Sequence, residues 1–270
     1  MATVRIHLLS DIHLESDPKR RERWRPDVLD ADVTVLAGDI DKGPRVPEWA
    51  SRTFPGRVLF VAGNHEFYNG HLQRTARKMR EAATDRVQFL DGDEVVISGV
   101  RFLGGTCWTD QECLLEGEPP EKHDWLREMS RKFVQAAMND YRRIRTVRGL
   151  SEFTRLSASD TAAAARRFKA WLADKLAEPF EGKTVVVTHH APLGSVAYPS
   201  RPKAMPMDFY DAAYCNSWPE LVAPPVDLWM WGHTHESVDT TRNGVRLVSN
   251  PCGYSYGEDT GFDPWKVIEL

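Results

Sequence analysis

Residues 58–66, with the sequence VLFVAGNHE, set the interpretation of the whole chain. The stretch begins with a short run of apolar, β-branched and aromatic residues, which is the composition of a buried strand. Gly63 then permits a tight turn, and Asn64 and His65 follow it directly. The pattern predicts a buried strand whose carboxyl end presents an amide and an imidazole to the same place.

The same pattern occurs elsewhere in the chain. Apolar runs at residues 4–9, 33–37, 184–188 and 228–231 also end in Gly or polar residues. In chain order, the five runs lead to Asp11 and His13, Gly38-Asp39, Asn64-His65, His189-His190, and His233 and His235. Helical patterns lie between the runs, so the alternation predicts an α/β fold. In such folds the carboxyl ends of strands border one crevice, where we expect these side chains to meet.

The residue types at the strand ends indicate a metal site. Carboxylates and imidazoles together suit Zn, Mn or Fe, and Asn64 adds a neutral carbonyl oxygen. Asp39 can give one oxygen to each of two ions, the two-metal arrangement used for displacement at phosphorus. Each motif alone is common by chance. Five of them in this order, each after an apolar strand, are not.

Other patterns complete the expected fold. Residues 97–103 and 238–248 are predicted as hairpins, the second turning at Asn243-Gly244, a residue pair that favours a type I′ turn. Residues 267–270 are predicted as a closing strand. Helices are predicted over 70–83 and 161–176, the second with Asp160 as its N-cap. The hairpins add antiparallel strands, so the predicted sheets are mixed.

The middle of the chain, from about residue 110 to 159, is polar and poor in strand signal. We interpret residues 1–270 as a single domain in which this middle part is a helical insertion or cap, with its best helix over 124–139. Substrate selection is expected to reside there, because the insertion carries aromatic and basic residues: Trp125, Phe133, Tyr141, Arg142, Arg143 and Arg145. The basic run that continues to Arg148 has two interpretations, a solvated helix face or a phosphate clamp.

Together the five motifs resemble the signature of the calcineurin-like metallophosphoesterase superfamily, and they span most of the chain. The resemblance implies a sandwich of two mixed β-sheets flanked by helices, with a site for two metal ions. It implies that Asp11, His13 and His235 hold one ion, that Asn64, His189 and His233 hold the other, and that Asp39 bridges them. It also implies that His65 is not a ligand but a catalytic residue that assists departure of the leaving oxygen.

The fourth motif is ambiguous from the residues alone, because His189 and His190 are adjacent. Consecutive side chains in extended backbone point to opposite sides, so the two are not expected to bind one ion equally. The resemblance favours His189, and His190 is then expected to support the ligands.

The predicted function is a dinuclear metal-dependent phosphoesterase that uses a metal-bridging hydroxide on a small-molecule or nucleotide substrate. The sequence after His189, His190-Ala191-Pro192, departs from the protein Ser/Thr phosphatase branch and is more similar to small phosphodiesterases. A phosphodiesterase is therefore favoured, with a phosphomonoesterase as the alternative and a nuclease or protein phosphatase behind it. A metal-binding scaffold without catalysis is disfavoured. The resemblance gives His65 no metal to hold, so its presence is explained by catalysis and not by metal binding.

The composition fits this interpretation. The chain has 270 residues, a net charge of −4 and four cysteines without a C-x-x-C pair. This charge gives no overall attraction to nucleic acid, and the cysteine spacing predicts reduced thiols in a cytoplasm rather than a disulfide framework. No apolar run is long enough for a membrane span, so no membrane association is expected. The oligomeric state is left open by the sequence.

Overall fold

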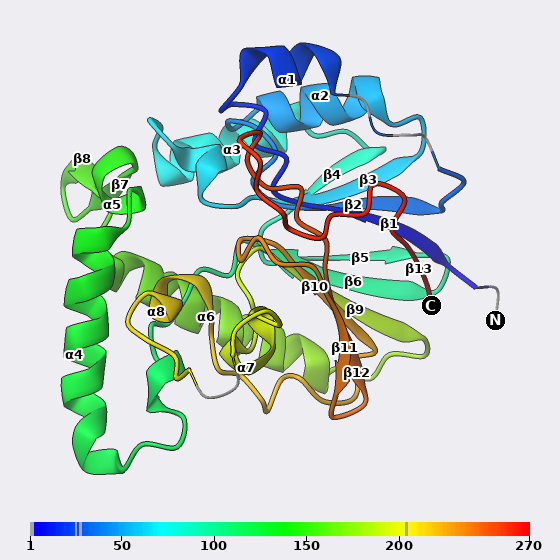
Figure 1. The fold of residues 1–270 in the computed structure, drawn as a ribbon. Coiled ribbons are helices and arrows are strands. Elements are labelled where there is room, and N and C mark those ends of the chain that lie inside the picture. Colours follow the sequence, from blue (N-terminus) through cyan, green and yellow to red (C-terminus); the bar gives the residue numbers. More distant parts are fainter. Residues whose placement is uncertain (1–2, 25, 27–28, 203–204) are drawn as a thin grey trace.

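Two β-sheets face each other in the computed structural model, which describes residues 3–24, 26, 29–202 and 205–270 (Figure 1). One sheet has five strands in the order β13-β1-β2-β3-β4, and the other has six in the order β11-β12-β10-β9-β6-β5. The first comprises β1 Arg5–Leu9, β2 Val33–Ala37, β3 Arg57–Val61, β4 Val87–Leu90 and β13 Val267–Glu269. The second comprises β5 Asp93–Ile97, β6 Val100–Gly105, β9 Lys183–Thr188, β10 Leu228–Trp231, β11 Val238–Arg242 and β12 Val245–Ser249.

Both sheets mix parallel and antiparallel strands, so the predicted mixed α/β sandwich is confirmed. Strands β1, β2, β3 and β4 run parallel, while β13 pairs with β1 in the antiparallel sense. In the other sheet β6, β9, β10 and β12 run parallel, and β5 and β11 are antiparallel edge strands. The two predicted hairpins are β5–β6 and β11–β12, and the second turns at Asn243 and Gly244 with φ values of 51° and 82°.

The alternation of side chains along each strand divides the apolar core in two. Ile6 and Leu8 of β1 point between the sheets, where they join Val185 and Val187 of β9 in one buried cluster. Leu9 belongs to a second cluster that lies under the helices. This is the pattern expected when both faces of a strand are covered.

Helices cover the outer faces of both sheets (Figure 1). Helices α1 Pro18–Arg23, α2 Arg45–Thr53 and α3 Leu72–Ala82 lie over the five-stranded sheet, and α6 Ala158–Ala177 lies over the six-stranded one. Arg101 of β6 is buried and donates a 3.0 Å hydrogen bond to the carbonyl of Lys175 near the end of α6. Within the described ranges, no helix is both long and apolar enough to cross a bilayer.

The predicted insertion contains η2 Cys113–Leu115, α4 Pro120–Ala137 and α5 Asp140–Arg143, followed by a hairpin of β7 Arg145–Arg148 and β8 Ser151–Arg155. The hairpin was not predicted and corrects the expectation of an all-helical segment. Helix α4 stands beside the two sheets rather than on either face (Figure 1). Short helices η1 His65–Phe67, α7 Gly194–Ala197 and α8 Asp211–Tyr214 complete the described elements.

Two further sequence expectations need correction. The N-cap of α6 is Ser157 and not Asp160, which is instead the third helical residue. The Asp160 carboxylate accepts from the Ser157 backbone N–H at 2.9 Å, so the two residues form a reciprocal capping box. Strand β4 was not anticipated, because its four residues, VQFL, are too few to show a period.

Candidate metal centre

The strand ends meet in one crevice between the two sheets. Strands β1, β2 and β3 are parallel neighbours in one sheet, and β9 and β10 are parallel neighbours in the other. Their carboxyl ends therefore carry the seven candidate ligands to the same edge of the sandwich: Asp11, His13, Asp39, Asn64, His189, His233 and His235. Six of them are buried and His235 is partly exposed.

Asp39 lies in the middle of this cluster. Its Oδ2 is 3.8 Å from the Nε2 of His13 and 3.5 Å from the Nε2 of His189. Asp11 and His235 lie on the His13 side, with 3.1 Å between the Nε2 atoms of His13 and His235 and 3.5 Å between Asp11 Oδ1 and His235 Nε2. Three groups of close ligand atoms result: Asp11-His13-His235, Asp39-His189-His233, and His13-Glu15-His65, which shares His13 with the first.

Asn64 completes the His189 side of the cluster. Its Oδ1 lies 3.3 Å from His189 Nε2, while its amide Nδ2 donates 2.9 Å away to the carboxylate of Asp140. The amide oxygen is thereby turned toward the imidazoles. His233 Nε2 is buried without a hydrogen-bond partner among the described residues. A buried nitrogen without a partner costs free energy, and a metal ion is the ligand that the surrounding donors fit.

The backbone at the ligands is unusual. Five of the seven adopt a left-handed conformation, with φ of 51° at Asp11, 49° at His13, 55° at Asp39, 67° at His233 and 52° at His235. This region is uncommon for residues other than glycine, and such conformations concentrate at functional sites. Three separate turns, which follow β1, β2 and β10, therefore hold strained backbone so that these ligand side chains face one another.

Glycine is required at two of the strand ends. A Cβ on Gly63 would lie 2.1 Å from Asp39 Oδ1 and 2.6 Å from His189 Nε2. A Cβ on Gly232 would lie 2.5 Å from Asp11 Oδ2. The space that a side chain would fill is thus occupied by ligand carboxylates and rings, as expected for a metal cradle.

Four acidic residues that were given no role from the sequence hold these ligands in place. Glu66 accepts from the backbone N–H groups of Asp39, Ile40 and Gly63 at 2.7–3.0 Å and so ties two strand ends together. Glu258 accepts from His235 Nδ1 at 2.9 Å. The other two are Glu15 and Asp140. Such outer hydrogen bonds orient metal ligands and set their tautomers.

His65 lies over the cluster. Its Nδ1 is 2.7 Å from Glu15 Oε1, and its Nε2 is 3.9 Å from Asp39 Oδ2 and 3.3 Å from the Tyr254 hydroxyl. Burial favours the neutral ring, but the Asp39 and Glu15 carboxylates outweigh burial and raise the pKa of His65. Burial would raise the pKa of Glu15, yet hydrogen bonds from His13 and His65 lower it to about 2. His65 is therefore held by one carboxylate with its second nitrogen directed at the cluster.

The two adjacent histidines of the fourth motif lie in different surroundings. His189 Nδ1 lies 2.9 Å from the Ala37 carbonyl, which leaves Nε2 facing Asp39 and Asn64. His190 instead uses Nδ1 to donate to the Thr106 carbonyl at 3.2 Å, and its ring packs against His233 with 4.4 Å between centroids. Burial and the charge of His189 lower the pKa of His190 to about 3, so its ring is neutral.

The arginines of the basic run in the insertion lie in different surroundings in the structure. Arg143 lines the cavity above the cluster and lies over the Tyr68 ring at 5.3 Å. Arg142 donates to the Ala136 carbonyl, Arg145 borders another cavity, and Arg148 pairs with Asp160. Trp125 and Phe133 pack toward Phe209, at 6.4 and 5.9 Å, and neither lines the cavity. Of the segment's six residues named for substrate selection, only Arg143 borders the cluster's cavity in the described structure.

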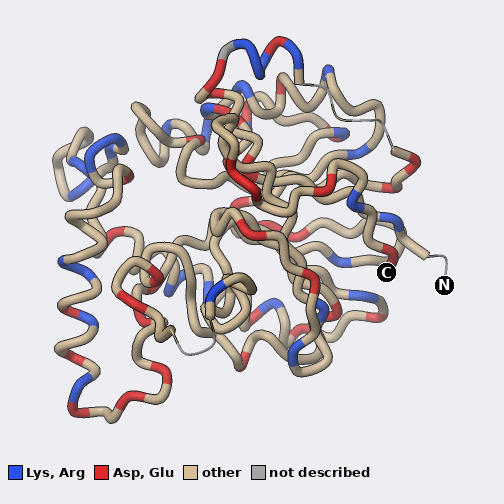
Figure 2. The backbone as a smooth tube through the Cα atoms, in the orientation of Figure 1, with Lys and Arg blue, Asp and Glu red and all other residues tan. Residues whose placement is uncertain are grey.

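Charge is distributed unevenly around the crevice. Figure 2 shows acidic segments gathered where the two sheets meet and basic ones on α1 and in the region of α5 and β7. The clustered carboxylates repel one another unless cations lie between them. Burial would raise the pKa of Asp39, but the surrounding imidazoles hold it well below its usual range, so the carboxylate is ionised.

Comparisons with known proteins agree with this geometry. Residues 4–237 match the family described as calcineurin-like phosphoesterase. The chain is 23% identical over 291 residues to uncharacterized protein L509 of Acanthamoeba polyphaga mimivirus, an alignment covering 98% of this chain and 96% of the viral one. The crystal structure of phosphopantetheinyl hydrolase (PptH) from Mycobacterium tuberculosis has a similar fold, with a TM-score of 0.64 and 16% identity over 98% of this chain and 95% of that one.

Proposed function

Because this chain belongs to the calcineurin-like phosphoesterase family, we propose that it hydrolyses phosphodiesters of small molecules or nucleotides with two bound metal ions. The family membership indicates metal-dependent phosphoester hydrolysis. The number of ions, the ligand roles and the preference for diesters are the proposal. The observation that carries it is the position of Asp39 Oδ2 between His13 of one ligand group and His189 of another.

We assign Asp11, His13 and His235 to one ion and Asn64, His189 and His233 to the other, with Asp39 shared. The distances of 3.8 and 3.5 Å from Asp39 Oδ2 to imidazoles on either side support a shared carboxylate. Imidazole and carboxylate donors suit Mn, Fe or Zn. When bound, such a pair supplies Lewis acidity toward phosphoryl oxygens and lowers the pKa of bound water.

His65 is proposed to donate a proton to the leaving oxygen. Its Nδ1 is fixed by Glu15, so only Nε2 is free to face a substrate, and the Tyr254 hydroxyl lies 3.3 Å from that nitrogen. Proton donation by a positioned side chain is typically worth about 10²–10⁴-fold in rate. Because His65 is not among the assigned ligands, this role can be separated from metal binding.

The cavity over the cluster supports a diester rather than a monoester. It has a volume of about 690 Å³ and is walled by Tyr68, Tyr198, Tyr210, Tyr214 and Tyr254, room and ring faces enough for two substituents on one phosphate. Its acidic lining residues, including Glu15 and Glu258, disfavour the second negative charge of a monoester. Among the described residues, Lys42 and Arg143 are the two Lys or Arg side chains that line it.

The test is a substrate panel with the enzyme loaded separately with Mn, Zn and Fe. Bis(p-nitrophenyl) phosphate and p-nitrophenyl phosphate share a leaving group and differ in charge, so they isolate the diester preference. We expect kcat/KM for the diester to be at least about tenfold higher, corresponding to about 1.4 kcal/mol. A higher value for the monoester would establish a phosphomonoesterase instead.

The natural substrate class needs a second set of compounds. Cyclic nucleotides represent small nucleotides, and single-stranded DNA represents a polymer. A phosphopantetheine diester represents the substrate group named for the Mycobacterium tuberculosis protein of similar fold. At 16% identity that likeness carries no substrate with it, so the phosphopantetheine diester is one compound among several. The net charge of −4 leads us to expect the least activity on DNA.

A further inference from the structure

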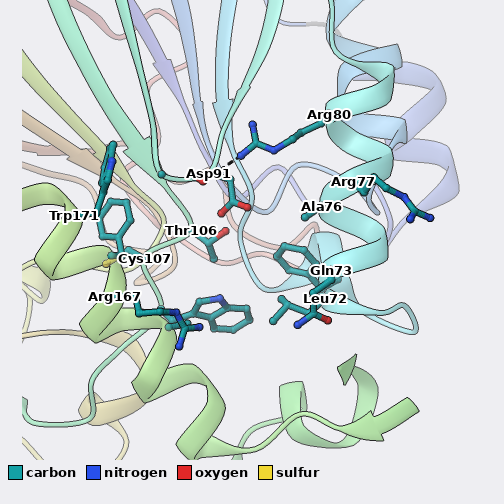
Figure 3. A pocket seen from close by; sticks show the side chains of 15 residues that line it. Leu72, Gln73, Ala76, Arg77, Arg80, Asp91, Thr106, Cys107, Arg167 and Trp171 are labelled. Atoms are coloured by element: carbon teal, nitrogen blue, oxygen red, sulfur yellow. Dashed lines mark hydrogen bonds between the residues drawn. The ribbon is translucent and has the colours of Figure 1, made fainter. Parts of the chain in front are cut away.

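A second cavity lies between helices α3 and α6 (Figure 3). Its volume is about 560 Å³, and it shares no lining residue with the cavity over the cluster. Leu72, Ala76 and Arg80 lie on one face of α3, and Arg167 and Trp171 come from α6 on the opposite side. The end of η1 and the segment after β6 form its floor.

The cavity has aromatic walls. Phe67 and Trp108 lie 6.1 Å apart between ring centroids, and Phe168 and Trp171 lie 5.3 Å apart. Phe168 and Trp171 are only partly buried, although both pack against the main core cluster. The facing helices line the cavity with the small residues Ala76 and Ala164. A flat apolar group bound in the cavity would cover the partly exposed rings of Phe168 and Trp171.

The cavity also has cationic sides. Arg77, Arg80 and Arg167 line it together with one carboxylate, Asp91, so the lining is net positive in formal charge. Arg80 pairs with Asp93 at 2.8 Å and Arg77 lies 3.5 Å from Glu81. Arg167 makes no hydrogen bond or ion pair within the described ranges, and its side chain borders the cavity (Figure 3). An exposed guanidinium without an acidic partner beside apolar rings suits an organic anion.

The floor supplies a third feature. Thr106 is 3% exposed and its hydroxyl has no hydrogen-bond partner among the described residues, although it lines the cavity. The next two residues, Cys107 and Trp108, both have left-handed backbone, with φ of 74° and 56°. A buried hydroxyl without a partner and two consecutive strained residues are costly, and strained backbone concentrates at functional sites.

We propose that this cavity is a binding site for a small organic anion with a flat aromatic body. The rings of Trp108, Phe168 and Trp171 contact the body, the Arg167 guanidinium pairs with the anionic group, and the Thr106 hydroxyl hydrogen-bonds a polar atom of the ligand. The site shares no lining residue with the cavity over the metal cluster, so this inference does not depend on which ester the enzyme hydrolyses.

The experiment uses two fluorescent probes on the metal-loaded full chain. The anionic probe is 8-anilinonaphthalene-1-sulfonate, and its neutral partner is N-phenyl-1-naphthylamine, which has the same rings without the sulfonate. We expect saturable binding of the sulfonate at one molecule per chain. Absence of saturable binding, or several equivalent sites, would overturn the proposal.

Matched variants locate the probe. Arg167→Gln should weaken sulfonate binding about tenfold, since a hydrogen bond to a charged group is lost, and should change binding of the neutral probe less than about twofold. Arg166→Gln, the exposed neighbour that does not line the cavity, should change neither. Equal effects of the two variants would contradict the proposal. So would a loss of binding in Arg143→Gln alone, because Arg143 lines the cavity over the metal cluster.

Substitutions that fill the cavity from either helix test whether the aromatic body of the ligand binds there. Ala164→Phe on α6 and Ala76→Leu on α3 should each reduce binding of both probes at least about tenfold by occupying the space. Thermal unfolding midpoints show whether each variant is folded. The two variants lie on opposite walls of the cavity, so the test remains if one of them fails to fold. Unchanged binding in a folded filling variant would exclude this cavity as the site.

Discussion

The crevice at the strand ends and the insertion after β6 contribute to the centre in opposite ways. The crevice receives seven candidate ligands from five strand ends, and the sheet topology alone brings them together. The insertion, at about residues 110–159, contacts the ligands through Asp140, and it lines the cavity above them with Ala137, Met138, Asn139 and Arg143. The difference leads us to infer that the sheets set the chemistry, and we propose that the insertion acts by positioning Asn64 and by contact with the substrate.

This contrast has an energetic basis. The candidate ligands follow directly on buried strands, and the backbone hydrogen bonds of those strands are made in the sheets, so the strand ends that carry the ligands are held in place. A residue on the insertion depends on packing between α4, α5 and the body of the protein. We therefore expect substitutions in the crevice to abolish activity and substitutions in the insertion to modulate it.

The largest effect is expected from Asp39→Ala. It removes the carboxylate proposed to touch both ions, so activity should fall by more than about 10³-fold, the equivalent of several kcal/mol of metal catalysis. Metal content should fall at both sites. Asp11→Ala should cost mainly one ion, so equal metal loss in the two variants would contradict the shared role of Asp39.

His65→Asn should lower kcat by about 10²–10⁴-fold while metal content stays near that of the wild type. The loss should be smaller for esters with very good leaving groups, which need less protonation. His123→Asn on α4, whose ring reaches only the Glu118 carbonyl in the described contacts, is the matched control. If His65→Asn loses its metals, His65 is a ligand and the proposed role is wrong.

The contribution of the insertion to the metal centre is tested at Asp140. Asp140→Ala leaves the Asn64 amide and the Tyr68 hydroxyl without their shared acceptor, at 2.9 and 2.7 Å in the structure. Loss of such an outer partner typically costs about 10–100-fold in metal affinity or activity. Asp124→Ala, on the exposed face of α4, should have no effect. Full activity in Asp140→Ala would show that the insertion does not position Asn64.

The smallest effect is expected at Arg143. Arg143→Gln removes one of two lining cations and should raise KM for a nucleotide diester about fivefold, which corresponds to about 1 kcal/mol. Its kcat should be nearly unchanged. Arg142→Gln is the control, because Arg142 is turned away to the Ala136 carbonyl. Identical KM values for the two variants would mean that the basic run is a solvated surface.

The fold could be predicted from the sequence because its strands carry strong local signals. All five apolar runs are strands, and Asn243-Gly244 forms the predicted turn. The hairpin of β7 and β8 could not be predicted, since Arg145–Arg148 and Ser151–Arg155 are polar and pair across a tight turn at the surface. The formation of these two strands depends on tertiary packing rather than on the strand propensity of their residues.

The candidate ligands could likewise be predicted, but the residues that hold them could not. Glu66 lies inside the third motif and Glu15 follows His13 by two residues, so proximity in sequence was an available signal for both. Asp140 is separated from Asn64 by 76 residues, and Glu258 from His235 by 23. No local sequence pattern connects these pairs. The acidic partner of each hydrogen bond is a single residue far away in the sequence, with no motif around it.

Metal content of the metal-saturated wild-type protein is the most direct test of the central claim, that the strand ends hold two ions around Asp39. Elemental analysis after removal of free metal, with chelator-treated protein as the blank, gives the number of ions per chain. The arrangement predicts about two ions per chain in the wild type and well below one in Asp39→Ala. One ion or none in the saturated wild type would contradict the two-metal centre.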